Sequence, residues 1–163
     1  MNFENELSLL YKEIAEQVSC MIPTKWDKFY FHGELREGEG EVYFFYTVPG
    51  KPEDFLYCYY IPETYNVDRD IYNQLENELF ELLVKLQDVF KRNVENIWYS
   101  FTMILEESGK MNADFSYTKW NLSKFGPSDR KDYFQYKYLK TVPKTDFDEK
   151  LMLEMEEFEK SHS

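Results

Sequence analysis

The chain has 163 residues, enough for one domain with a sizeable core. Its 19 Lys and Arg against 31 Asp and Glu give a formal net charge of −12 at pH 7, which argues against direct contact with nucleic-acid phosphates or anionic lipid. Fourteen Phe, 14 Tyr and three Trp argue against a disordered acidic tail, because disorder goes with few aromatic residues.

Cysteine usage and the N-terminal sequence predict a cytoplasmic protein. Cys20 and Cys58 are far apart and form no CxxC motif. The N-terminus lacks the positive region and long apolar stretch of a secretory signal. No apolar run approaches the roughly 20 residues that span a bilayer, so we expect no membrane segment.

The first half of the chain changes its hydrophobic period. Apolar residues at steps of three and four from Leu7 to Val18 predict an amphipathic helix that Pro23 ends. The period then becomes two, which predicts strands over 29–35, 42–48 and 55–61. Turns are expected at the EGEG sequence of 37–40 and at Pro49 and Gly50.

A long helix and a hairpin follow. Acidic residues near Asp68 and Asp70 and an apolar stripe from Ile71 to Phe90 predict a helix of more than five turns. Alternation over 97–105 and 111–117, with Ser108 and Gly109 between, predicts a hairpin with one solvated face. We therefore expect an α+β fold: a single antiparallel sheet of about five strands, order α-β-β-β-α-β-β-α-α, with helices packed on one face.

The pattern of residues 128–163 predicts two further segments. Residues 128–139 fit either a helix or a strand, and we favour the helix. Beyond Pro143, Thr145 and Asp148 have the spacing of a helix cap, and an apolar stripe runs from Phe147 to Phe158. We expect residues 1–163 to form a single domain.

The sequence contains few residues or motifs typical of catalysis or of cofactor or metal binding. His32 and His162 are the only histidines, so neither a histidine-based triad nor a multi-histidine metal site can be assembled. No nucleotide-binding or nucleophile motif is present, and the many carboxylates show no metal-ligand spacing. We expect no catalytic, cofactor-binding or metal-binding residues, and no enzyme.

Surface charge and tyrosines point instead to a protein partner. Acidic residues cluster around the first hairpin, and residues 145–163 hold seven acids against two lysines. Solubility explains any single charge, but such a field also steers a basic partner. Tyrosine is enriched in interface hot spots. The candidate partner-binding residues are Glu34, Glu37, Glu39, Glu41, Tyr59, Tyr60, Tyr65, Glu154, Glu156 and Glu157.

Several long segments, in order, resemble the YezG/EsaG-type immunity proteins. They are LYKEIAEQVSCMIPTKWDKFYFHGEL at 10–35, YYIPETYNV at 59–67, LLVKLQDVFKRN at 82–93, WYSFTMILEESGKMNADFSY at 98–117 and RKDYFQYKYL at 130–139. The resemblance implies one immunity-protein domain over 1–163. It also implies a cytosolic antitoxin without catalysis that binds the nuclease domain of a type VII-secreted toxin, either the producer's own toxin or a related one.

The physical and family arguments agree on a basic partner, because a nuclease domain must hold DNA. We expect the hairpin and C-terminal carboxylates to occupy or border its phosphate-binding cleft, with tyrosines as anchors. Distortion of the nuclease from a neighbouring surface is the competing mechanism. Three alternatives stay open: an acidic protein-binding adaptor or orphan paralogue without nuclease inhibition, an uncharacterised enzyme, and a homodimer that forms through the stripe at 147–158.

Overall fold

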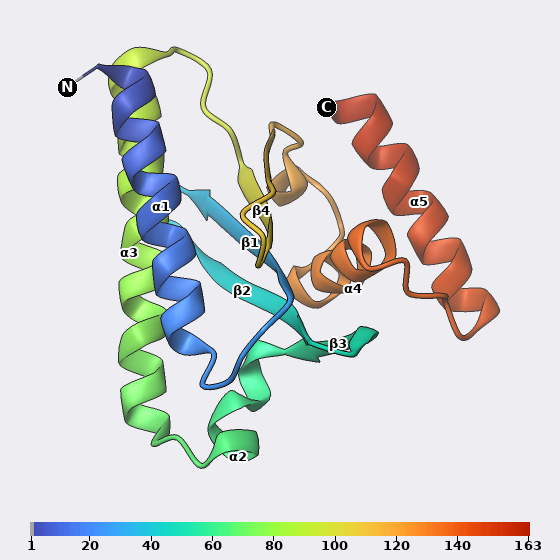
Figure 1. The fold of residues 1–163 in the computed structure, drawn as a ribbon. Coiled ribbons are helices and arrows are strands. Elements are labelled where there is room, and N and C mark those ends of the chain that lie inside the picture. Colours follow the sequence, from blue (N-terminus) through green and yellow to red (C-terminus); the bar gives the residue numbers. More distant parts are fainter. Residues whose placement is uncertain (1) are drawn as a thin grey trace. The chain divides into compact units, whose positions relative to one another are not determined.

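The computed structural model describes residues 2–163, which form two compact units (Figure 1). The N-terminal unit ends at Phe115, and the C-terminal unit comprises Ser116–Ser163. The N-terminal unit contains α1 (Phe3–Met21), β1 (Lys28–Arg36), β2 (Glu39–Val48), β3 (Lys51–Tyr57), the 3-10 turn η1 (Cys58–Tyr60), α2 (Ile61–Tyr65), α3 (Arg69–Asn93), β4 (Ser100–Glu106) and β5 (Met111–Ser116), whose last residue lies past the boundary. The C-terminal unit contains η2 (Trp120–Leu122), α4 (Pro127–Tyr138) and α5 (Asp146–His162).

The five strands form one sheet in the order β3-β2-β1-β4-β5. β1 pairs antiparallel with both β2 and β4, and β2 pairs antiparallel with β3. The central strand therefore places Phe31 between Phe44 and Met103, and all three side chains are completely buried. The α+β class, the antiparallel sheet and the predicted order of elements are confirmed.

Two long helices cover the face of the sheet that carries Phe31. In Figure 1, α1 and α3 run antiparallel and side by side. The side-chain carboxamide of Gln17 on α1 donates to the carbonyl oxygen of Leu75 on α3 at 2.9 Å, and Tyr11 of α1 stacks on Phe101 of β4. The buried leucines of the α3 stripe, such as Leu83, complete this core.

Local sequence signals set the ends of these helices. The Asn2 side chain caps α1 by accepting from the N–H of Asn5 at 2.8 Å. The Asp68 carboxylate caps α3 by accepting from the N–H groups of Asp70 and Ile71. Lys91 and Arg92 lie in the last turn of α3, where positive charge favours the helix dipole.

Glycine permits two close approaches around β1. A Cβ on Gly33 would lie 2.7 Å from a methyl group of Leu83, so α3 can approach the sheet here only because the side chain is absent. A Cβ on Gly40 would overlap the carbonyl oxygen of Glu34 in the paired strand. Gly33 therefore allows the packing of α3 on the sheet, and Gly40 allows the close pairing within the acidic hairpin.

Two local predictions are corrected. The third strand ends at Tyr57, and the chain then turns through η1 into the short helix α2, so Tyr59 and Ile61 are not strand residues. Pro62 at the start of α2 favours this helical turn. The hairpin face expected to be solvated is buried at Ser100 and Thr102. Thr102 Oγ1 lies 2.9 Å from His32 Nδ1, a hydrogen bond that compensates for its burial.

The C-terminal unit is helical. Residues 127–138 form α4, so the helix favoured by the sequence analysis is confirmed over the strand. Thr145 caps α5 by accepting from the N–H of Asp148 at 3.0 Å, as its spacing predicted. Trp120 packs against Tyr133 of α4 and Phe158 of α5 and provides this unit with an aromatic core. That the whole chain acts as one domain stays a prediction.

Candidate partner-binding surface

The turn between β1 and β2 presents carboxylates to solvent. Glu37 and Gly38, the two turn residues, both have positive φ, 53° and 81°, which is the backbone of a two-residue type I′ hairpin. This tight turn leaves the Glu37 side chain 81% exposed. Glu39 is exposed as well, whereas Glu41 is half-buried.

Glu34 differs from the other candidates of the hairpin. It is 4% exposed, and its carboxylate Oε2 lies 3.5 Å from His32 Nε2. Glu34 also faces Glu41 and Ser100 across the neighbouring strands. A buried carboxylate with these neighbours has little surface to offer a partner, so Glu37 and Glu39 are the accessible acids here.

Two exposed tyrosines lie where β3 gives way to η1. Tyr59 is 54% exposed and Tyr60 is 55% exposed. Their rings contact each other edge to face at 5.4 Å, and Tyr57 stacks on Tyr59 at 6.2 Å. Tyr65 is only half-buried, but its hydroxyl accepts a hydrogen bond from Tyr46 at 3.1 Å. Tyr59 and Tyr60 are therefore the more available anchors.

Arg69, at the start of α3, fixes the position of Tyr59. Its guanidinium donates to the Tyr59 carbonyl oxygen at 3.2 Å and lies 4.8 Å from the centre of the Tyr59 ring. The second contact is a cation–π interaction, which holds the ring face against the cation. Tyr59 thus stays exposed while losing little further freedom on binding, as expected of a preorganised interface anchor.

Two carboxylates, one on α3 and one on β2, interact electrostatically with each other, and the one on α3 also interacts with Arg69. Burial raises the pKa of Glu76 on α3, the negative charge of Glu41 on β2 raises it further, and Arg69 opposes both effects. Glu76 is thus half-buried near a like charge, and Arg69 partly offsets both effects on its carboxylate. An additional cation from a partner would stabilise the charged form of Glu76. We call Glu41, Tyr59, Tyr60, Arg69 and Glu76 the Tyr59–Glu76 cluster.

Sequence reasoning did not include Arg69 and Glu76 among the candidates. Their seven-residue spacing, two turns of a helix, placed them on one face of the long predicted helix. Nothing in the sequence indicated that this face would meet β2 at Glu41 and η1 at Tyr59.

The candidates on α5 belong to the C-terminal unit and mostly have partners there. Glu154 forms an ion pair with Lys124 at 3.1 Å. The interaction with the Glu156 carboxylate raises the pKa of the Tyr136 hydroxyl. Glu157 is exposed.

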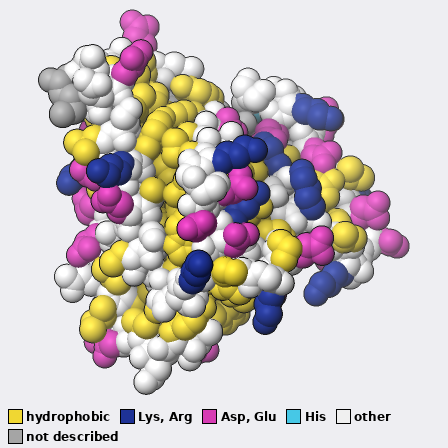
Figure 2. All heavy atoms as spheres, viewed as in Figure 1, with side chains coloured by type: hydrophobic (Ala, Val, Ile, Leu, Met, Phe, Trp, Pro, Cys, Tyr) yellow, Lys and Arg dark blue, Asp and Glu magenta, His cyan; other side chains and the backbone are white. Residues whose placement is uncertain are grey.

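The net charge is distributed unevenly between the two units. Residues up to Phe115 contain 22 Asp and Glu against 10 Lys and Arg, a net charge of −12. The C-terminal unit contains nine of each, so its net charge is zero. Figure 2 shows Lys and Arg side chains interspersed with Asp and Glu over α4 and α5. The long-range field of the chain therefore originates in the N-terminal unit.

Within residues 2–163, no group of three or more His, Cys, Asp and Glu side chains is arranged to hold a metal ion. None of the helices described here is long and apolar enough to cross a membrane.

Comparison with known proteins identifies the family. Residues 7–153 match the model of the YezG-like immunity proteins, so the chain belongs to this family. It is 34% identical to the type VII secretion system protein EsaG of Staphylococcus aureus, over 97% of this chain and 96% of that protein. It is 38% identical to the immunity protein YezG of Bacillus spizizenii over 83% of each chain. Identity to YezG of Bacillus subtilis is 29%, over 88% of this chain and 95% of that protein.

Proposed function

We propose that this protein is a cytoplasmic immunity protein that binds and inhibits the nuclease domain of a toxin exported by type VII secretion. Two findings support the proposal: membership of the YezG-like family, and similarity to a type VII secretion system protein over nearly the full length of both chains. An immunity protein acts by binding its toxin, so the role proposed here needs no catalytic residue and no cofactor.

The nuclease part of the proposal is carried by the charge of the N-terminal unit. A nuclease domain holds DNA through cationic side chains, and a surface of net charge −12 is complementary to such a groove. The same charge repels nucleic acid and anionic lipid, so the proposed partner is the toxin protein itself. Electrostatic attraction of this kind increases association rates by about one to three orders of magnitude.

Two features of the N-terminal unit form the proposed contact. Glu37 and Glu39 on the hairpin turn supply exposed negative charge. The Tyr59–Glu76 cluster supplies Tyr59 and Tyr60 as aromatic anchors. Its carboxylates, Glu41 and Glu76, favour a lysine or arginine of the partner. Contact through Glu154, Glu156 and Glu157 on α5 stays a separate prediction.

The first test is co-expression with the nuclease domain of a type VII-secreted toxin from the same genome, followed by pull-down and a DNA-cleavage assay. We expect a stable complex in which cleavage is abolished. A complex that still cleaves DNA would favour the acidic adaptor over the antitoxin. Failure to bind any encoded toxin would indicate an orphan paralogue or a different partner.

The second test neutralises the hairpin. The triple variant Glu37→Gln, Glu39→Gln and Glu41→Gln should associate with the nuclease domain about tenfold more slowly at low salt. Its association rate should also depend less steeply on salt, because fewer charges contribute to steering. Stopped-flow association across a salt series measures both quantities.

A matched control removes the same charge elsewhere on the N-terminal unit. Glu4→Gln, Glu81→Gln and Asp88→Asn change three exposed carboxylates of α1 and α3. If this variant slows association as much as the hairpin variant does, net charge matters and the hairpin does not. Wild-type kinetics in both variants would favour distortion through apolar contacts, in which salt has little influence.

A further inference from the structure

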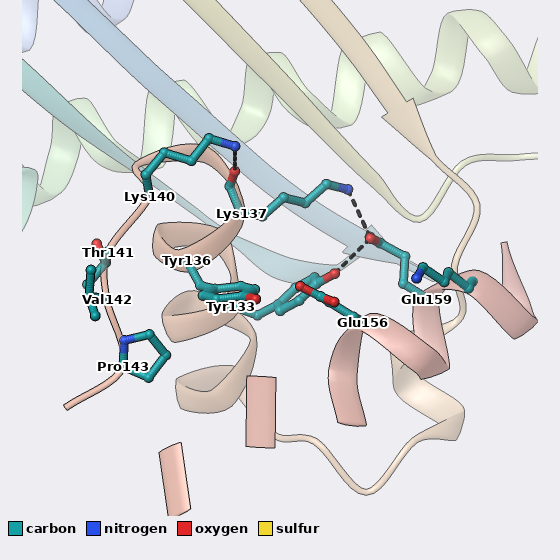
Figure 3. Close-up of a pocket in the computed structure, with 10 residues that line it drawn as sticks. Tyr133, Tyr136, Lys137, Lys140, Thr141, Val142, Pro143, Glu156 and Glu159 are labelled. Carbon is teal, nitrogen blue, oxygen red and sulfur yellow. Dashed lines mark hydrogen bonds and ion pairs between the residues drawn. The ribbon is translucent and has the colours of Figure 1, made fainter. Parts of the chain in front are cut away.

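The C-terminal unit contains an open groove of about 490 Å³ between α4, the segment that follows it and α5 (Figure 3). Tyr133 and Tyr136 of α4 form its floor, and Val142 and Pro143 form one side. Lys140 and Lys160 also line it. We call this hollow the α4–α5 groove. Its volume is within the range of sites that hold a small ligand or a few side chains of a peptide.

The backbone after α4 creates the groove. Lys140 adopts the left-handed conformation, with φ of 61°, and the N–H of Thr141 donates to the Gln135 carbonyl oxygen at 3.2 Å. The chain therefore leaves the helix in a fixed direction. A left-handed lysine costs free energy that a glycine would avoid, and such strain gathers at functional positions.

The apolar side of the groove is unusually exposed. Val142 has 77% of its surface accessible, one of the highest values for an apolar side chain in this protein. It lies beside Pro143 and the ring of Tyr136, both half-buried. A partner's apolar side chain placed here would remove this surface from water at little cost in ordering the groove.

The two carboxylates that line the groove are already engaged by side chains of the floor. Glu159 accepts from the Tyr133 hydroxyl at 2.9 Å and from the Lys137 ammonium at 3.0 and 3.1 Å. Glu156 interacts with Tyr136 and raises the pKa of its hydroxyl. Burial and the hydrogen bond to Glu159 raise the pKa of Tyr133, so its hydroxyl remains a donor. Dashed lines in Figure 3 mark the contacts of Glu159 and the hydrogen bond from Lys140 to the Lys137 carbonyl oxygen.

The remaining cations have unused donors. Lys140 donates one hydrogen bond, to the Lys137 carbonyl oxygen at 2.8 Å, and Lys160 forms no ion pair within residues 2–163. An ammonium group has three donors, so both side chains can bind an anion. Three lysines and two glutamates line the groove, which leaves it net positive in a chain of charge −12.

We propose that the α4–α5 groove binds an acidic peptide segment of a partner protein. An apolar side chain of that segment lies against Val142 and Tyr136, and a neighbouring carboxylate is held by Lys140 and Lys160. Nucleic acid fits less well, because its successive phosphates would meet Glu156 and Glu159, whereas the peptide needs only one carboxylate beside the two lysines and an apolar side chain at Val142. This site is separate from the proposed nuclease contact, which is acidic and attracts a basic surface.

Nuclear magnetic resonance of the full-length, ¹⁵N-labelled protein tests the site without any toxin, so its outcome is independent of the proposed function. The probe is a blocked hexapeptide of alternating leucine and aspartate. We expect amide shifts concentrated at Lys140, Thr141, Val142 and Lys160. The same peptide with asparagine in place of aspartate should bind about fivefold more weakly, because it lacks the charge that the lysines attract.

Charge reversal with a matched control completes the test. Lys140→Glu with Lys160→Glu should weaken binding of the aspartate peptide at least about tenfold. Lys119→Glu with Lys150→Glu makes the same change at exposed lysines outside the groove and should leave binding unchanged. Val142→Ser should weaken the binding of both peptides, because both place a leucine against this side chain.

Three outcomes would overturn the proposal. The first is the absence of shifts at the groove at millimolar peptide, and the second is equal binding of the two peptides. The third is a groove that responds to a hexathymidylate but not to the acidic peptide, which would assign the lysines to phosphate instead.

Discussion

Gln87 is a buried polar side chain that joins three elements of the N-terminal unit. It is 2% exposed, and its amide nitrogen donates to the carbonyl oxygens of Leu35 and Trp98, each at 3.1 Å. The N–H of Leu35 in turn donates to the Tyr99 carbonyl oxygen at 3.0 Å. One amide thereby ties α3 to the end of β1 and to the segment that leads into β4, next to the acidic hairpin.

Gln87→Leu should destabilise the protein by about 2 kcal/mol, because two buried carbonyl groups lose their donor. Urea unfolding followed by circular dichroism measures the change. The control Gln74→Leu lies exposed on the same helix and should change stability by less than about 0.5 kcal/mol. Equal stability of the two variants would contradict the structural role assigned to Gln87.

At the scale of elements, α3 and β2 interact through charged residues of the Tyr59–Glu76 cluster. Burial and the charge of Glu41 raise the pKa of Glu76 despite Arg69. A raised carboxyl pKa means that the folded state binds the proton more tightly than the unfolded state. The corresponding stability is fully present below the unfolded pKa and is lost as the pH rises through the folded value.

Glu76→Gln should therefore stabilise the protein at pH 7, by about 0.5 kcal/mol after allowance for solvent screening. The advantage should shrink toward zero as the pH falls below the ordinary glutamate pKa of about 4.3, where the carboxyl is protonated in both the folded and the unfolded state. Urea unfolding at several pH values measures this difference. A constant difference across the series, or destabilisation at pH 7, would show that Glu76 is stabilised by its neighbours instead.

The helix α4 illustrates how far local pattern goes for one element. Its residues alternate well enough for a strand, yet Phe134 and Tyr138, four residues apart, contact at 4.9 Å as they can only in a helix. Pro127 in the first turn supports the helix. The deciding contacts, those of Tyr133 with Trp120 and Glu159, come from residues distant in sequence.

At the scale of the whole molecule, the net charge lies in the N-terminal unit, and the C-terminal unit is neutral. The sequence made the acidic residues of α5 candidates for partner binding, because residues 145–163 carry five more negative than positive charges. The preceding residues 116–144 carry seven Lys and Arg against two acids, and Lys124 and Lys137 pair with Glu154 and Glu159. The C-terminal unit neutralises itself, whereas the N-terminal unit keeps its whole charge.

Two triple variants of equal charge should therefore differ. Neutralising Glu154, Glu156 and Glu157 to glutamine should slow association with the nuclease domain by less than about twofold. The hairpin variant, in contrast, should lose about tenfold. Stopped-flow measurements at one low salt concentration compare them directly. A larger effect from the α5 variant would move the proposed contact to α5 and contradict the assignment to the hairpin.

The sequence by itself determined the class, the order of elements and most helix ends, because hydrophobic period and capping residues act over a few neighbouring positions. It also determined the net charge. It selected Glu37, Tyr59 and Tyr60 as candidates, and the structure exposes all three side chains; that they bind a partner stays a prediction.

Only the tertiary structure decided which of these residues stand together. The burial of Glu34, the contact of Arg69 with Tyr59 and the approach of Glu76 to Glu41 depend on how α3 lies on the sheet. The α4–α5 groove depends on one left-handed residue and on helix packing. These are contacts between residues far apart in the chain, which no local pattern encodes.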